Sequence, residues 1–407
     1  MITLRLVLHL ILILLALLFN HLGKWPFLQT LIFFLMALPL IALISGFILR
    51  RRVKLGLSTE AELVERGEVA RWIIRVDNPS FFFTLFCHAR LRSARLYPDQ
   101  PYLERDFLLP RRGLSEIRFE HSATHCGPLE LSALELWLKD PFGFFMFKLT
   151  ESKKLEALDK IYVLPQKMDL LAETAEAEMQ LEEGAFLAKK SMSEIDEIDR
   201  MRQMQPGDRI KSIHWKLSAR VQDWMVKQYE KAEERQVLFL FDLPKIPAKA
   251  SNLEREDTLF LRDTILEHST ALLERFLMND FIVKLLLSGV QPANLTASKI
   301  SDFEFLRQAL AKIPLDPPEA LEMQLRDELT NPEKKLFFVI TDSLTASSVG
   351  LLSVLQKENA GCVLAYYIAD AISAEQYELL SELALAKVKI LLYNRYGEEV
   401  HDESIQL

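Results

Sequence analysis

Two long apolar stretches stand at the beginning of the chain. Leu4–Leu22 carries polar residues only near its ends, and Phe27–Leu49 contains no charged residue. The second stretch would be about 34 Å long as a helix, which is enough to cross the hydrocarbon layer of a membrane. Four basic residues follow it, against one lysine in the short connection between the stretches: Arg50, Arg51, Arg52 and Lys54. We therefore expect a two-helix transmembrane hairpin over residues 1–54, with both ends in the cytoplasm.

A cleaved signal peptide is the alternative interpretation of the first stretch. Such a peptide ends at a cleavage site with small residues. No site of this kind precedes the second apolar stretch. The hairpin is therefore the better interpretation.

The pattern changes to short strands separated by turns over residues 55–165. Glu68–Val76 and the stretch from Leu129 to Leu138 have the composition of strands. The first ends at Asp77-Asn78-Pro79, and the second is followed by the turn sequence Asp140-Pro141-Phe142-Gly143. This spacing favours a β-sandwich of the immunoglobulin-like kind.

Strand and helix signals alternate over residues 224–407. Six stretches favour strands, namely 224–230, 236–241, 282–287, 335–340, 361–367 and 387–392. Helical patterns lie between most of them, at 258–278, 300–312, 347–358 and 373–383. Such alternation predicts an α/β domain of the doubly wound type, whose mostly parallel sheet is covered on both faces.

A connector over residues 166–223 joins these two predicted domains. Residues 170–202 are rich in Glu and Ala, which favours either a helix or a mobile acidic segment. Beyond the turn Pro206-Gly207, Asp208 stands where it would cap a helix. The helical period then predicts an apolar face (Ile210, His214, Leu217, Val221) and a polar, mainly cationic face (Arg209, Ser212, Lys216, Arg220).

This connector carries a motif whose residues recur at fixed spacing. It comprises Arg202, Pro206, Gly207, Asp208, Arg209, His214, Trp215, Lys216, Ser218 and Arg220. The motif resembles the signature of the bacterial family known as domain of unknown function 58. It departs from that signature at Met204, where an aromatic residue is usual, and at Val221, where Thr is common.

The resemblance extends over nearly the whole chain and implies an architecture. Members have a membrane hairpin, a β domain that ends in a sequence similar to residues 140–145, and a C-terminal domain similar to von Willebrand factor A domains. Relatives are commonly paired with MoxR-type AAA+ ATPases. The resemblance therefore implies a protein of the bacterial inner membrane that works with such an ATPase in assembling or maturing complexes of the cell envelope.

The resemblance also directs attention to the ends of two predicted strands. Asp242 follows one strand, and Asp342 with Ser343 follows another. In von Willebrand factor A domains, Asp and Ser side chains at these places hold Mg²⁺, a hard cation that prefers oxygen ligands. Here Pro244 and Ile246 occupy the two serine positions, and Lys245 lies between them. We therefore expect the metal site to be lost or weak, and no cofactor to be required.

Composition narrows the classes of function. The formal net charge of −8 argues against a nucleic-acid-binding protein. Three dispersed cysteines fit a reducing compartment. Neither a Gly-rich phosphate loop nor a Gly-x-Ser-x-Gly elbow occurs. We expect a non-enzymatic interaction protein.

Two alternative functions stay open. One is a metal-dependent protein, either an Mg²⁺ enzyme that uses Asp242, Asp342 and His214 or an adhesion-type module that uses Asp242 and Asp342. The other is a module that binds anionic lipid through the cationic helix, unless that helix pairs with the nearby acidic residues Glu194, Asp196, Glu197 and Asp199.

Overall fold

The computed structural model describes residues 3–23, 25–79, 85–93, 103–149, 160–167, 198–204, 213–229, 236–246, 251–287, 294–315, 321–330, 335–358 and 361–400. It divides into two compact units. The first comprises residues 1–165 and 247–259, and the second comprises residues 166–246 and 260–407.

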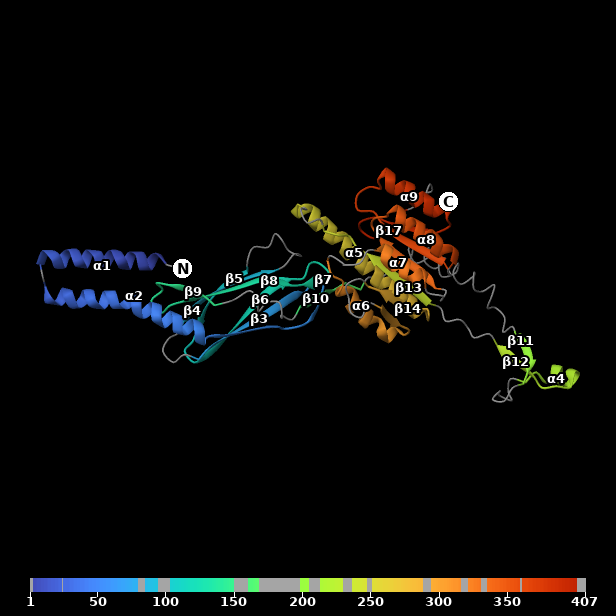
Figure 1. Ribbon diagram of the computed structural model, residues 1–407, viewed down its shortest axis with the longest axis horizontal. Coiled ribbons are helices and arrows are strands. Elements are labelled where there is room, and N and C mark those ends of the chain that lie inside the picture. Colours follow the sequence, from blue (N-terminus) through green and yellow to red (C-terminus); the bar gives the residue numbers. More distant parts are fainter. Residues whose placement is uncertain are drawn as a thin grey trace. The chain divides into compact units, whose positions relative to one another are not determined.

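Two helices, α1 (Leu4–Gly23) and α2 (Pro26–Arg52), begin the first unit. Figure 1 shows them side by side as a hairpin. Both are long and apolar enough to cross a membrane. Pro39 of α2 has no N–H, so the carbonyl of Leu35 loses its helical partner. His9 of α1 replaces it, because its Nε2 lies 2.8 Å from that carbonyl oxygen and a carbonyl can only accept a hydrogen bond.

The rest of the first unit is built of antiparallel sheets. One has the order β1-β3-β6 and another has the order β5-β4-β8-β9. Their strands are β1 (Lys54–Thr59), β3 (Val69–Asn78), β4 (Leu85–Ser93), β5 (Leu103–Leu109), β6 (Gly113–Ser122), β8 (Leu131–Lys139) and β9 (Met146–Lys148). A small sheet of order β2-β10-β7 contains β2 (Leu63–Glu65), β7 (Gly127–Leu129) and β10 (Ile161–Leu164).

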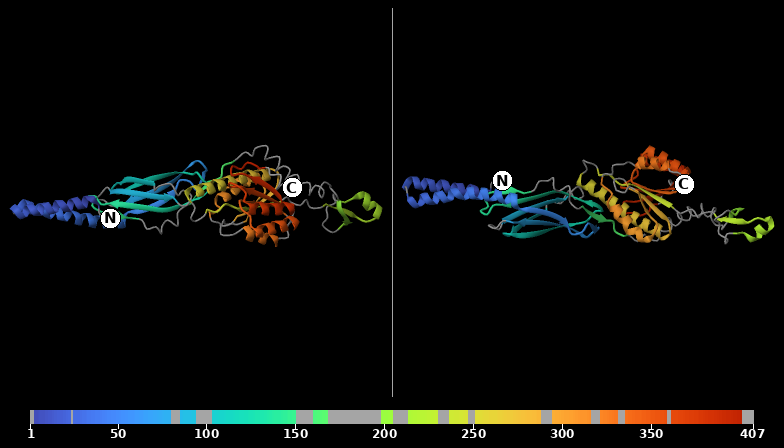
Figure 2. Two further views of the ribbon diagram at one scale, coloured as in Figure 1. Left: turned by 90° about the horizontal axis from the view of Figure 1, so that it is seen from above. Right: turned by 60° about the horizontal axis from the view of Figure 1, so that its bottom comes forward.

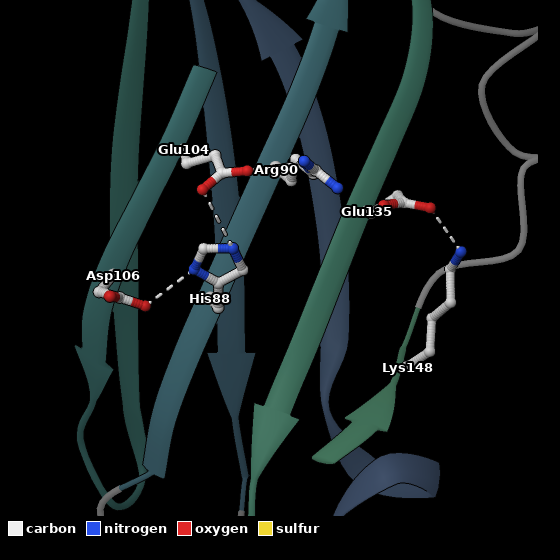
Figure 3. A network of polar contacts seen from close by, with 6 residues as sticks. All are labelled: His88, Arg90, Glu104, Asp106, Glu135 and Lys148. Atoms are coloured by element: carbon white, nitrogen blue, oxygen red, sulfur yellow. Dashed lines mark hydrogen bonds and ion pairs between the residues drawn. The ribbon is translucent and has the colours of Figure 1, made fainter. Parts of the chain in front are cut away.

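The two larger sheets bury alternate residues, as strands with one solvated face do. Trp72 and Ile74 of β3 are buried, as are Cys87 and Ala89 of β4. The opposite face of the four-stranded sheet is polar (Figure 3). There His88 Nδ1 lies 2.9 Å from Asp106 Oδ1, and further ion pairs join Arg90 to Glu104 and Lys148 to Glu135. The sheet-rich character expected for residues 55–165 is therefore present.

The second unit contains a mixed six-stranded sheet of order β15-β14-β13-β16-β17-β18. Its strands are β13 (Gln236–Asp242), β14 (Ile282–Leu286), β15 (Asn294–Ala297), β16 (Leu336–Thr341), β17 (Gly361–Tyr367) and β18 (Lys389–Tyr393). All neighbours are parallel except β15, which is antiparallel to β14. The chain adds strands first on one side of β13 and then on the other, so the strand order reverses between β13 and β16.

Helices pack on both faces of this sheet, as Figure 2 shows. They are α5 (Asn252–Met278), η3 (Ile300–Asp302), α6 (Phe303–Ala311), α7 (Leu321–Leu329), α8 (Ala346–Glu358) and α9 (Ala374–Leu385). On one face, Leu325, Leu352 and Leu380 of α7, α8 and α9 share a core with the strands. On the other, Phe276 of α5 stands edge-on to Phe239 at a centroid distance of 5.6 Å. The strand–helix alternation expected from the sequence is present.

A separate two-stranded sheet pairs β11 (Ile198–Gln203) with β12 (Met225–Tyr229) and leads to α4 (Trp215–Val221). Two predictions are wrong here. The segment that ends at Arg202 was expected to be helical or mobile, yet its last residues form β11. The strand predicted at residues 224–230 is present as β12, but it pairs with β11 and lies outside the six-stranded sheet.

Candidate functional site

The motif residues lie on this small hairpin, which we call the signature module (β11, Ile213, His214, α4 and β12). The backbone N–H of Met204 donates to the carbonyl of Trp224 at 2.7 Å. The N–H of His214 donates to Met225 O at 2.8 Å, and Ile213 forms a β-bridge to Val226. Both Ile213 and Val226 are buried. The module is therefore held together mainly by backbone pairing around a very small core.

The helix of the module begins later than the sequence predicts. We expected it to run from the cap Asp208 through His214, but α4 begins at Trp215. Ile213 is engaged in the β-bridge, so the helical period cannot continue through it. Pro206, Gly207, Asp208, Arg209 and Ser212 lie outside the described residues.

His214 has a different role from the one expected. The sequence pattern places it on the apolar face of a helix. Instead it is the N-cap of α4, and its Nδ1 accepts a hydrogen bond from the N–H of Leu217 at 3.0 Å. The same N–H also lies 3.0 Å from the carbonyl oxygen of His214, so the ring and the carbonyl share this first-turn donor. A ring that holds the helix in this way is a structural element of the module.

Ser218 joins α4 to β12. Its hydroxyl lies 3.0 Å from the carbonyl of His214 and accepts the N–H of Met225 at 2.9 Å. The side chain is buried. The helix then ends at Gln222, whose φ of 60° lies in the left-handed region that closes many helices. Gln203 Nε2 donates to Asp223 Oδ2 at 2.8 Å and fixes the following turn.

Two tryptophans form the outer surface of the module. Trp215 is 59% exposed and Trp224 is 55% exposed. Their rings meet edge to face with centroids 5.6 Å apart. Val221, Lys216 and Arg220 of α4 are exposed as well. Most exposed apolar side chains need no special explanation, but a pair of mutually ordered tryptophans beside two cations has the composition of a protein-binding site.

The sequence pointed to Trp215 but not to its partner. Trp224 lies beyond the motif and was read only as the start of a strand. The turn over Gln222 and Asp223, together with the pairing of β12 with β11, brings its ring to Trp215. Arg202 lies on β11, in register with Val226.

The second predicted site lies where the strand order of the six-stranded sheet reverses. Asp242 ends β13 and Asp342 follows β16, so the sheet does bring the two carboxylates to the same edge. The hydroxyl of Thr341 lies 3.2 Å from Asp242 Oδ2 and 2.7 Å from Ser343 O. Ser343 itself is exposed.

Burial raises the pKa values of both carboxyl groups at this edge. Burial, and then the neighbouring charge of Asp242, raise the pKa of Asp342 to about 6. Burial also raises the pKa of Asp242, while Lys245 opposes the shift in both. Two carboxylates that resist ionisation together are typical of a site that lacks a sufficient counter-charge.

The donors present fit a divalent cation poorly. Pro244 and Ile246 offer no side-chain oxygen, and Lys245 contributes a positive charge instead. Within the described ranges, no three His, Cys, Asp or Glu residues are grouped so that they could hold a metal ion. His214 belongs to the signature module, where it caps α4.

Comparison with known proteins identifies the family. Residues 200–375 match the model described as "Protein of unknown function DUF58". This region of the chain belongs to that family. It includes all but the first two residues of the signature module and most of the six-stranded sheet. No curated protein matches the chain.

Similar solved structures give no further information. The CARDB domain of a Pyrococcus furiosus protein, solved with di-metal ions, is 10% identical and has a TM-score of 0.19, covering 28% of this chain and 87% of that domain. A β-glucosidase from Erythrobacter marinus is 12% identical with a TM-score of 0.16, covering 24% of this chain and 15% of its own. The DNA glycosylase AlkC of Pseudomonas fluorescens is 11% identical with a TM-score of 0.17, covering 26% and 34%. TM-scores this low carry no argument about fold or function.

Proposed function

We propose that this DUF58 protein is a membrane-anchored interaction protein of the bacterial inner membrane. The hairpin of α1 and α2 spans the bilayer, and the two soluble regions lie in the cytoplasm. The length and apolarity of the helices support the anchor. The cluster Arg50–Arg52 at the end of α2, against a single lysine in the connection, supports the orientation.

This proposal rests on which motif residues are bonded inside the module and which are exposed on its surface. His214 and Ser218 have their polar atoms bonded within the module, where they hold α4 against β12. What the module offers to a partner is the pair Trp215–Trp224 with the cations beside it. Tryptophan and arginine dominate the binding energy of many protein interfaces, which makes this surface suited to contact.

We propose a MoxR-type AAA+ ATPase as the partner. Support for this choice comes from the family, since DUF58 proteins are commonly paired with such ATPases. The joint task would be the assembly or maturation of envelope protein complexes. In this arrangement the anchored chain recruits the ATPase, which would supply the energy of nucleotide hydrolysis.

At the level of domains, we propose an immunoglobulin-like sandwich for residues 55–165 and a von Willebrand factor A-like domain at the C-terminus. The two antiparallel sheets support the first proposal. The reversal of strand order between β13 and β16, with an aspartate at each strand end, supports the second. The degenerate donor set at that edge favours contact with a protein over metal chemistry.

A binding experiment tests the proposal. The full-length protein is reconstituted in nanodiscs, and its affinity for a purified MoxR-type ATPase from the same organism is measured. We expect the double variant Trp215→Ala/Trp224→Ala to bind at least about tenfold more weakly, because exposed aromatic anchors are the usual hot spots.

A matched control is Phe305→Ala, which removes an exposed aromatic ring from α6. This variant should bind like the unaltered protein. Equal affinities for all three proteins would contradict the role of the tryptophan pair. Absence of binding by the unaltered protein would contradict the choice of partner.

A further inference from the structure

The loop that follows β8 lies against the apolar part of the membrane hairpin. Phe144 is buried in a cluster with Leu6 of α1 and Ala42 of α2. The ring of Phe147 occupies the space that a Cβ on Gly46 would fill. A larger residue at position 46 would displace this ring. The β domain is therefore seated beside the hairpin itself and not only attached to its end.

The position of this contact along α2 follows from helix geometry. Gly46 and Ala42 precede Arg52 by about 9 Å and about 15 Å along α2, since a helix rises 1.5 Å per residue. Arginines at the end of a membrane helix lie among the lipid headgroups. With Arg52 at the headgroups, these distances would bring the loop of residues 140–147 to the boundary between glycerol groups and acyl chains.

Several polar backbone groups of the loop have hydrogen-bond partners within the protein. Polar backbone groups in a bilayer need partners within the protein, because no water is present to supply them. Asp140, which is buried, accepts the N–H groups of Phe142, Gly143 and Phe145. Thr3 donates its N–H to Phe144 O at 3.0 Å and lies with its hydroxyl 2.6 Å from Gly143 O.

The loop carries one exposed aromatic ring, and the guanidinium group of Arg5 lies close to the neighbouring Gly143. Phe142 is 37% exposed and stacks on Phe144 at a centroid distance of 5.9 Å. The same end of the β domain carries three exposed apolar residues, because strand pairing brings the beginning of β4 to the ends of β5 and β8, and β6 begins just after β5 ends: Phe86, Leu108 and Leu114. Aromatic side chains at this level form the interfacial belt of membrane proteins.

We propose that the loop of residues 140–147 is inserted into the interfacial layer of the bilayer and is a third membrane contact besides α1 and α2. The proposal rests on the hairpin being the membrane anchor. Its ligand is the lipid itself, at the boundary between glycerol groups and acyl chains. The contact fixes one end of the β domain at the membrane surface, so that the domain stands in a defined orientation to the bilayer.

Site-directed spin labelling in liposomes tests this inference. The three native cysteines are free and buried, and they are replaced by alanine in the full-length chain. Single cysteines are then introduced as Phe142→Cys in the loop, Phe33→Cys on the exposed side of α2 and Glu62→Cys at an exposed position between β1 and β2. Accessibility to oxygen reports lipid, and accessibility to a water-soluble nickel chelate reports solvent.

We expect the label at position 142 to resemble that at position 33, with high oxygen and low nickel accessibility, whereas the label at position 62 is reached by nickel. If position 33 is in lipid but position 142 is in water, the loop is not inserted and the anchor stands. If position 33 is also in water, the anchor proposal fails. Because residues 142, 33 and 62 are exposed, the labels should not disturb folding.

Discussion

The signature module and the carboxyl edge of the six-stranded sheet use their polar residues in opposite ways. In the module, His214 and Ser218 are bonded to the backbone, and the groups left outside are aromatic rings and cations. At the sheet edge, Asp242 and Asp342 lie at the ends of neighbouring strands, and burial together with the charge of Asp242 raises the pKa of Asp342. In the module, the polar side chains of His214 and Ser218 have hydrogen-bond partners. At the sheet edge, the carboxyl group of Asp342 is disfavoured from ionising by burial and by the charge of Asp242.

This difference shows that the residue of a motif with the most reactive side chain can have a structural role. His214 looks like a general base in the sequence, but its role in the structure is to cap a helix. Among the described residues of the motif, the exposed side chains are those of Trp215, Lys216 and Arg220. Variants that remove the internal bonds should therefore act on stability, and variants of the rings should act on binding.

The largest effect is expected from Ser218→Ala. The change leaves the N–H of Met225 without the hydroxyl that it now reaches at 2.9 Å. A buried donor that loses its partner costs about 1–3 kcal/mol. Hydrogen exchange of the module amides should become faster, with no change in the six-stranded sheet. Unchanged exchange at Met225 would show that Ser218 does not hold the module together.

A smaller effect is expected from His214→Ala, which removes the cap of α4. Loss of an N-cap typically costs about 1 kcal/mol. His214→Asn is the matched control, because asparagine also accepts a hydrogen bond from the first turn. Protection of the α4 amides should fall in the first variant and stay near its normal value in the second. If both variants lose protection equally, the role of the ring is not capping.

At the sheet edge, Asp342→Asn should stabilise the protein in a pH-dependent way. The pKa of Asp342 is about 6 in the folded chain against an ordinary value of 3.8, so ionisation at neutral pH opposes folding. Below about pH 4 the carboxyl is neutral in both states and the variant gains nothing. Between these values the gain should grow, reaching its full size above about pH 6. Melting temperatures across this range, which should differ by a few degrees at most, provide the measurement.

The smallest effect is expected from Mg²⁺. A ligand stabilises the folded state only in proportion to its binding, and the edge offers few oxygen donors. Millimolar Mg²⁺ should leave the melting temperature nearly unchanged. A rise of several degrees that Asp342→Ala abolishes would instead show a working metal site and favour the enzymatic alternative.

Local patterns were sufficient for much of the fold. Long apolar stretches give α1 and α2, and buried β-rich stretches give β13, β16 and β17. These elements are predictable because the length and composition of each apolar stretch favour one type of secondary structure over the other. The edge of the sheet followed from the same argument, since Asp242 and Asp342 directly follow two of these strands.

Features that depend on contacts between residues far apart in the sequence could not be predicted from local patterns. Ile213 lies in a helical pattern, but its bridge to Val226 overrides that local preference. Arg262 of α5 looks like a surface residue, yet it is buried and donates to the carbonyl of Ile313 at 2.9 Å. The place of the ring of Trp224 beside Trp215 likewise needs the fold of the whole module.

The hydrogen bond from His9 to Leu35 makes the two apolar helices α1 and α2 specific to one another. Pro39 cannot donate the backbone hydrogen bond that Leu35 O would receive within α2, and His9 of α1 donates to this oxygen instead. A generic leucine-rich segment grafted in place of α1 would be equally apolar but would leave that carbonyl oxygen without its partner, which is most costly if the hairpin spans a bilayer as proposed. The anchor is thus a matched pair, whose first helix cannot be exchanged without regard to the second.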